Sequence, residues 1–270
     1  MKLEKPIMMA SAVALALFFC GMDYAEADQS TLSALEIARR SDKARRSDSE
    51  HQIMTMTLEN HRGQQRIRTL EGWSRELGND EQQRFSRFLK PADVRDTTLL
   101  TYDYPHQDDD TWLYLPALKK VKRILSSNKK DSFMGSDFSY EDMENLDLIN
   151  QDYRLTGTET IAGQDCWIIE STPNNEEEIK DSAYSKTISW IAKKDFLTHK
   201  VEFHDKKNRL AKRLLLEDIH PTSDDDPRPR AHRMLMYNLI TKHKTVLDLS
   251  TLELDVEVND EMFSQRNLRR

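Results

Sequence analysis

The sequence predicts a mainly β protein built on an antiparallel sheet. Three stretches alternate apolar and polar residues with the two-residue period of a strand that buries one face. They are residues 54–58, 197–203 and 252–258. Strands of this kind favour an antiparallel sheet that packs on one side and faces water on the other. The chain has 270 residues, of which 37% are hydrophobic, so it can bury a sizeable core.

The N-terminus has the pattern of a secretory signal peptide. Lys2 and Lys5 precede an apolar run over residues 7–19, and Ala25-Glu26-Ala27 supplies a site of small residues for cleavage. The apolar run is shorter than the roughly 20 residues that a membrane-spanning helix needs. We therefore expect cleavage after Ala27, a periplasmic location, and a single mature domain over residues 28–270.

Two cysteines bear on this location. Cys20 follows Phe18 and Phe19, which are too large for a lipid-modified cysteine, so we assign it to the removed peptide. Cys166 then remains alone and cannot form an intramolecular disulfide. It stands in an apolar run with Trp167, which favours a buried structural thiol over a nucleophile.

The mature chain begins with a predicted helix over residues 31–46, capped by Ser30 or Thr31, because Leu32, Leu35 and Ile37 recur at helical spacing. Turn residues at 59–63, 77–80 and 204–208 then predict connections between strands. Besides the three alternating stretches, the pattern predicts strands at residues 65–75, 82–89, 97–102, 111–115, 166–171, 186–192, 209–218 and 233–241.

Residues 116–152 do not fit a strand pattern. Six basic residues occur in their first half, and the acidic residues Asp137, Glu141, Asp142, Glu144 and Asp147 follow, with aromatic and aliphatic residues between them. We expect an irregular or partly helical segment, of the kind that often covers a binding site. Its basic part, residues 118–130, suits docking on an anionic membrane surface or a partner protein. The alternative is a charged surface loop whose apolar residues pack into the core, and the pattern leaves both open.

The sequence offers little for catalysis, metal binding or nucleic acid. It contains no H-E-x-x-H, G-x-S-x-G or P-loop motif, and its eight histidines are scattered. The acidic triplets at 108–110 and 224–226 lack the spacing of a calcium loop, so we interpret them as solvated. A net charge of −7 argues against a nucleic-acid partner. We expect a protein that is not an enzyme and uses no cofactor or metal.

Five aromatic residues lie on successive predicted strands. On a strongly curved sheet they would line an apolar cavity on the concave face, whereas otherwise they form a packed core. Periodicity does not separate the two, and the residues alone favour a packed core. They are Trp73, Phe85, Phe88, Trp112 and Tyr114.

One pair of segments carries a family resemblance. The segments W-L-Y-L-P-A-L-K-K-V-K-R at 112–123 and S-F-M-G-S-D-F-S-Y-E-D-M at 132–143 resemble those of LolA-like outer-membrane lipoprotein-sorting proteins. The segments at 187–192 and 259–268 fit the same family. The resemblance implies an incomplete, curved antiparallel β-barrel closed by helices and a lid loop, with an apolar cavity for acyl chains. It also implies an inner-membrane exporter of the RND/MMPL type as a partner.

The resemblance leads to a functional hypothesis. We expect a periplasmic carrier that shields a lipid or acylated protein, with the five aromatic residues at its cavity. The alternatives are a lipid sensor or accessory subunit of an envelope transporter, and a lipid-directed enzyme using Asp137, Glu141 and Asp142. A lid or docking loop would be formed by Leu118, Val121, Ile124, Phe133, Met134, Phe138 and Tyr140.

Overall fold

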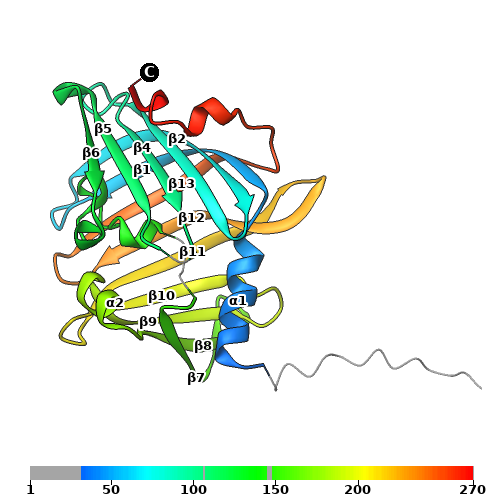
Figure 1. The fold of residues 1–270 in the computed structure, drawn as a ribbon. Coiled ribbons are helices and arrows are strands. Elements are labelled where there is room, and N and C mark those ends of the chain that lie inside the picture. The colour runs from blue at the N-terminus through cyan, green and yellow to red at the C-terminus, as the bar shows by residue number, and fades with distance from the viewer. Residues whose placement is uncertain (1–31, 106, 145–147, 270) are drawn as a thin grey trace, which may run out of the picture. The chain divides into compact units, whose positions relative to one another are not determined.

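The computed structural model describes residues 32–105, 107–144 and 148–269, which belong to one unit (Figure 1). The predicted signal peptide and the predicted caps Ser30 and Thr31 lie outside the described residues. Within the described part, no helix is long and apolar enough to cross a membrane.

The unit is built on one antiparallel sheet of thirteen strands, in the order β6-β5-β4-β3-β2-β1-β13-β12-β11-β10-β9-β8-β7. The chain therefore starts at the centre of the sheet, runs to the edge strand β6, and crosses to the other edge strand, β7. It then returns strand by strand until β13 pairs with β1, and the sheet does not close. The strands are β1 (Ser49–Glu59), β2 (Gln65–Gly78), β3 (Glu81–Lys90), β4 (Thr98–Asp103), β5 (Asp110–Leu115), β6 (Lys120–Ile124), β7 (Gln151–Ile161), β8 (Gln164–Pro173), β9 (Tyr184–Ala192), β10 (Thr198–Asp205), β11 (Leu210–Ser223), β12 (Asp226–Asn238) and β13 (His243–Leu254).

The antiparallel β fold predicted from alternation is confirmed, with two differences in detail. Strands β6 and β7 were not predicted, because each lies at an edge and carries many polar residues. The stretch predicted at 252–258 is largely misplaced: strand β13 runs from His243 to Leu254, and Val258 instead packs on the first half of the sheet. The described residues of the segment 116–152 are irregular as expected apart from β6 and the start of β7, and they contain several short 3-10 turns.

Helix α1 (Ala34–Arg45) begins later than predicted. Its N-cap is Ser33, whose side chain accepts a hydrogen bond from the Glu36 amide. The helix packs its fully buried Ile37 against Trp167 and Ile169 of β8. A short helix, α2 (Glu176–Asp181), is capped by Asn175 between β8 and β9.

The two faces of the sheet carry separate hydrophobic clusters. On β3, Arg84 and Ser86 face a cavity on the inner face, so the intervening Phe85 points to the opposite, outer face. There Phe85 and Leu100 pack with Phe263 and Leu268 of the C-terminal segment, residues 255–269. Figure 1 shows this segment, in red, beside the strands of the first half. The buried Cys166 lies in another small cluster, with Trp190 and Ala192.

Candidate functional site

A cavity of about 1980 Å³ lies along the inner face of the sheet. Its volume is well above the roughly 300–1,000 Å³ of ordinary small-molecule sites. At one end its lining is polar and comes from α1, the β2–β3 turn and the β4–β5 loop. Elsewhere the strands provide an apolar wall made of Met54, Met56, Leu70, Leu99, Val201, Phe203, Leu214, Leu216, Met234 and Leu247.

Residues 131–144, here named the inner loop, also line this cavity. Phe133 is buried against Phe88, with ring centroids 5.9 Å apart, and meets Tyr140 edge-on at 5.7 Å. Phe138 packs instead with Tyr184 and other residues of the second half of the sheet. The inner loop therefore contributes apolar contacts to both halves of the sheet.

Carboxylates of the inner loop bind it to the second half of the sheet. Asp142 is almost fully buried and accepts hydrogen bonds from the Lys212 ammonium at 2.9 Å and the Tyr184 hydroxyl at 2.7 Å. Asp137 accepts a 2.8 Å bond from the Thr245 hydroxyl, which in turn accepts from the Asp137 amide at 2.9 Å. Burial raises the pKa of Asp137, an effect that the Thr245 bond opposes.

Glu141 makes the third such attachment. It accepts hydrogen bonds from the Ser182 hydroxyl and, at 2.7 Å, from the amide of Ala183, the residue just before β9. Burial raises the pKa of Glu141, while these two bonds lower it. The three carboxylates of the enzyme hypothesis thus each fix the inner loop to a different strand or strand end.

Arginines of β2 and β3 fix the other side of the inner loop. Arg68 donates to the Met134 carbonyl at 2.5 Å, and Arg84 of β3 donates to the Met143 carbonyl. Met134 and Gly135 both have positive φ, of 51° and 75°, so the chain turns sharply between these attachments. Glycine adopts such a backbone without strain, which gives Gly135 of the motif a structural role.

Two partly buried acids lie at the end of the inner loop, Glu144 within it and Asp109 in the β4–β5 loop. Burial raises the pKa of Glu144 to about 8, with a further increase from Asp109 and a decrease from Lys129. Burial likewise raises the pKa of Asp109 to about 7, assisted by the charge of Asp103. At neutral pH Glu144 is therefore mostly protonated, and this side of the cavity carries less negative charge than its composition indicates. Among the described residues, no group of three or more His, Cys, Asp or Glu is arranged to hold a metal ion.

The five aromatic residues considered for the cavity fall in different places. Trp73 packs in the outer cluster with Phe85, with ring centroids 6.1 Å apart, and only borders the cavity. Phe88 is fully buried on the inner face, in the cluster beneath the inner loop. Phe85, Trp112 and Tyr114 belong to the outer cluster covered by the C-terminal segment. Register explains this grouping, because Trp73 pairs with Phe85, Phe85 with Leu100, and Leu100 with Trp112.

The seven residues considered for a lid are also divided. Four of them line the cavity: Ile124, Phe133, Phe138 and Tyr140. Met134 packs behind them, whereas Val121 joins the outer cluster and Leu118 is 62% exposed. The apolar wall on β1, β11, β12 and β13 was not singled out from the sequence. Its alternating pattern marked those residues as one face of a sheet, which is equally the pattern of a filled core.

Comparison with known proteins identifies relatives that share this architecture. No curated protein matches the chain. A solved outer membrane lipoprotein-sorting protein domain from Vibrio parahaemolyticus is 33% identical over 88% of this chain and 98% of its own, with a TM-score of 0.81. A DUF1329 family protein from Desulfovibrio piger is 33% identical over 87% of this chain and 97% of its own, with a TM-score of 0.80.

Two further matches agree. A LolA superfamily protein from Nitrosomonas europaea, 20% identical over 87% of this chain and 99% of its own, shares the fold with a TM-score of 0.66. A family model described as that of an uncharacterized protein covers residues 80–270. With the sheet, the cavity and these matches together, the chain belongs to the LolA-like family of outer-membrane lipoprotein-sorting proteins.

Proposed function

We propose that this protein is a periplasmic carrier that shields acyl chains of a lipid or an acylated protein inside the cavity. The observation that carries the proposal is the cavity of about 1980 Å³ with an apolar wall, in a member of this family. Acyl chains gain about 25 cal/mol for each Å² of apolar surface they bury. A single myristoyl chain reaches a membrane affinity of only about 10⁴ M⁻¹, so such binding also permits release.

The ligand would lie between the strand wall and the inner loop. On one side it would contact the apolar residues of β1 and β11–β13, and on the other Phe133, Phe138 and Tyr140. Phe85, Trp112 and Tyr114 would support the wall from the outer face. An exporter of the RND/MMPL type as cargo donor remains part of this proposal and rests on the family resemblance.

Binding without turnover is the favoured activity. Asp137, Glu141 and Asp142 are engaged with Thr245, Ser182 and Lys212, where they position the inner loop. A catalytic carboxylate must be free to exchange a proton with a substrate. These contacts therefore support a scaffolding role for the acidic part of the motif.

Native mass spectrometry on protein purified from the periplasm without detergent tests the proposal. A lipid or acylated peptide bound in stoichiometric amount is the expected result. Protein that is empty and also fails to take up a fluorescent fatty acid would contradict it. Transfer of the bound lipid between donor and acceptor vesicles then distinguishes a carrier from a sensor.

Paired variants locate the ligand. Leu216 and Met234 are cross-strand partners that line the cavity, so the double variant Leu216→Glu/Met234→Glu should lose uptake. Leu215→Glu is the matched control, because Leu215 is the next residue along β11 and points to the other face. Uptake that survives in the folded double variant would exclude this wall as the binding surface.

A further inference from the structure

Charge is unevenly distributed along the strand direction of the first half of the sheet. Antiparallel pairing places the last residues of β1, β3 and β5 at the same end of the sheet as the first residues of β2, β4 and β6. The β12–β13 turn lies beside them. The C-terminal segment reaches the same end, since Thr98 donates to the Leu268 carbonyl at 2.8 Å. We name this region the basic end.

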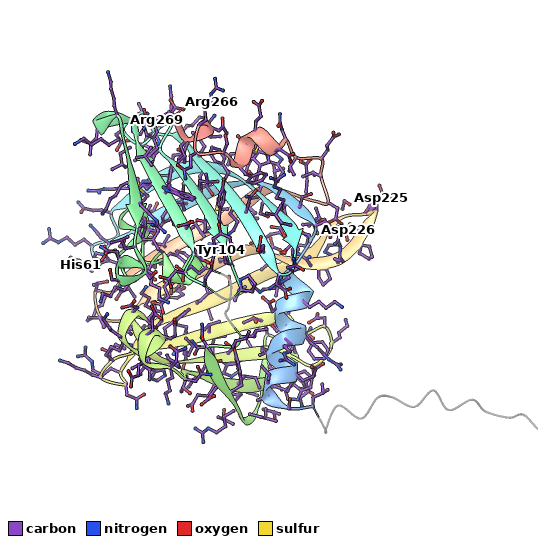
Figure 2. All side chains as sticks on the ribbon, viewed as in Figure 1. His61, Tyr104, Asp225, Asp226, Arg266 and Arg269 are labelled. Atoms are coloured by element: carbon purple, nitrogen blue, oxygen red, sulfur yellow. The ribbon has the colours of Figure 1, made fainter. Side chains whose placement is uncertain are left out.

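Ten exposed basic side chains occur at the basic end, against two exposed acids, Asp93 and Asp96. Figure 2 shows two of the basic residues, Arg266 and Arg269, on the C-terminal segment. This concentration stands out in a chain whose net charge is −7. The ten are Arg62, Arg66, Lys90, Arg95, Lys119, Lys120, Lys122, Lys242, Arg266 and Arg269.

Within the described residues, none of these ten side chains takes part in an ion pair. At the opposite end of the same strands the arginines are neutralised. Arg46 meets Asp42 at 2.8 Å, Arg84 meets Asp103 at 3.0 Å, and Arg228 meets Asp255 at 2.5 Å. The basic end therefore presents positive charge that the protein itself does not compensate, which favours an anionic partner.

Large exposed aliphatic side chains accompany this charge. Ile67 of β2 is 57% exposed and Leu118, in the turn before β6, is 62% exposed. Leu239 and Ile240 in the β12–β13 turn are 40% and 58% exposed. Thus four of the nine large hydrophobic residues found exposed in the described chain lie at the basic end. Such residues mark interaction surfaces when they gather among polar ones.

We propose that the basic end docks on the surface of a membrane that contains anionic phospholipids. Lysine and arginine near such a surface each strengthen binding, and aliphatic side chains among them enter the boundary between headgroups and acyl chains. The aliphatic residues come from three separate turns or strand starts at one end of a sheet. That arrangement fits a lipid surface better than a nucleic acid, whose phosphates offer nothing to exposed isoleucine or leucine.

This proposal is separate from the carrier function, because the two surfaces differ. The turns at the basic end are not among the residues that line the cavity, whose polar end is formed by α1, the β2–β3 turn and the β4–β5 loop. Docking through the basic end would hold the protein at a membrane and leave that polar end of the cavity free. Either proposal can therefore fail without the other.

Vesicle flotation with protein purified from the periplasm tests the docking proposal. Vesicles of phosphatidylcholine with about a third phosphatidylglycerol should carry the protein upward at low salt, and those of phosphatidylcholine alone should not. Half-molar salt should release it, since the Debye length is then only a few Å. Equal binding to both kinds of vesicle, or no binding to the anionic ones, would overturn the proposal; capture of an acidic protein instead would point to a protein partner.

Three double variants give the test its specificity. Arg66→Glu/Lys120→Glu should weaken binding at least about tenfold, because each basic residue at the surface contributes roughly fivefold. Ile67→Ser/Leu118→Ser should weaken binding while keeping its salt dependence. Lys43→Glu/Lys194→Glu changes the net charge equally at exposed sites elsewhere and should bind as the unaltered protein does. A loss as large in this control as in the first variant would refute a localised surface.

Discussion

Replacing Asp142 by asparagine removes the buried charge that holds the inner loop to β11. The Asp142 side chain is 1% exposed and its partner Lys212 is 16% exposed, with 2.9 Å between Oδ2 and Nζ. The variant leaves the Lys212 ammonium without its carboxylate in a position where water reaches it poorly. Breaking a buried pair in this way costs about 3–5 kcal/mol of the free energy of unfolding.

The lower part of that range is expected here. Lys212 keeps some contact with water and lies 5.5 Å from the Tyr184 ring centroid. The asparagine oxygen can still accept the Ser139 amide bond that Asp142 accepts at 2.8 Å. We therefore expect Asp142→Asn to lower the free energy of unfolding by about 3 kcal/mol.

Urea denaturation of four proteins measures this as a double-mutant cycle: the unaltered protein, Asp142→Asn, Lys212→Met and the double variant. Since the double variant no longer buries an unpaired charge, it should be more stable than the sum of the single losses predicts, by about 2 kcal/mol. Losses that add within about 0.5 kcal/mol would show that the pair does not hold the loop.

Three other predictions concern separate parts of the molecule. Burial lowers the pKa of His51, but its hydrogen bonds to Glu253 and Glu71 outweigh this and raise it. The imidazolium of His51 therefore stabilises the fold at acid pH, and this stabilisation is lost as the pH rises through the raised pKa. In His51→Gln, the urea midpoints at pH 5.5 and pH 8.5 should consequently differ less than in the unaltered protein. Glu144 has a raised pKa of about 8, so its ionisation destabilises the fold increasingly between about pH 4.5 and 8. Glu144→Gln should accordingly raise the urea midpoint at pH 8.5 and change it little at pH 4, and an equal effect at both would contradict the assignment. Leu268→Ala truncates a fully buried side chain and should cost about 2–5 kcal/mol by urea denaturation; a loss below about 1 kcal/mol would mean that the C-terminal segment does not cover the outer face.

Most strands could be predicted because they bury one face, so apolar and polar residues alternate along them. Strand β6 escaped prediction because its sequence, K-V-K-R-I, pairs on one side only and keeps its lysines exposed. Edge strands of natural sheets commonly carry such charges, which prevent pairing with another chain. The same charges removed the pattern by which the strand would have been identified.

The cavity was harder to derive than the sheet. Alternation shows which residues share a face but not which face is hollow, and the spacing separates Phe85 from Phe88 because three positions along a strand lead to opposite faces. The role of the inner loop had no local signal. Asp137 bonds to Thr245, 108 positions away, and Asp142 to Lys212, 70 positions away, so only the folded chain brings these partners together.

The two terminal segments pass to opposite halves of the sheet. Strands β1 and β13 are neighbours at its centre, yet α1, which precedes β1, packs on β7–β9, while the segment that follows β13 packs on β3–β5. Each terminal segment therefore connects one of the two central strands to the opposite half of the sheet. Bending the sheet about that pair would pull at Ile37 on one side and Leu268 on the other, both fully buried. We therefore expect these two attachments to resist bending of the sheet about its central strands.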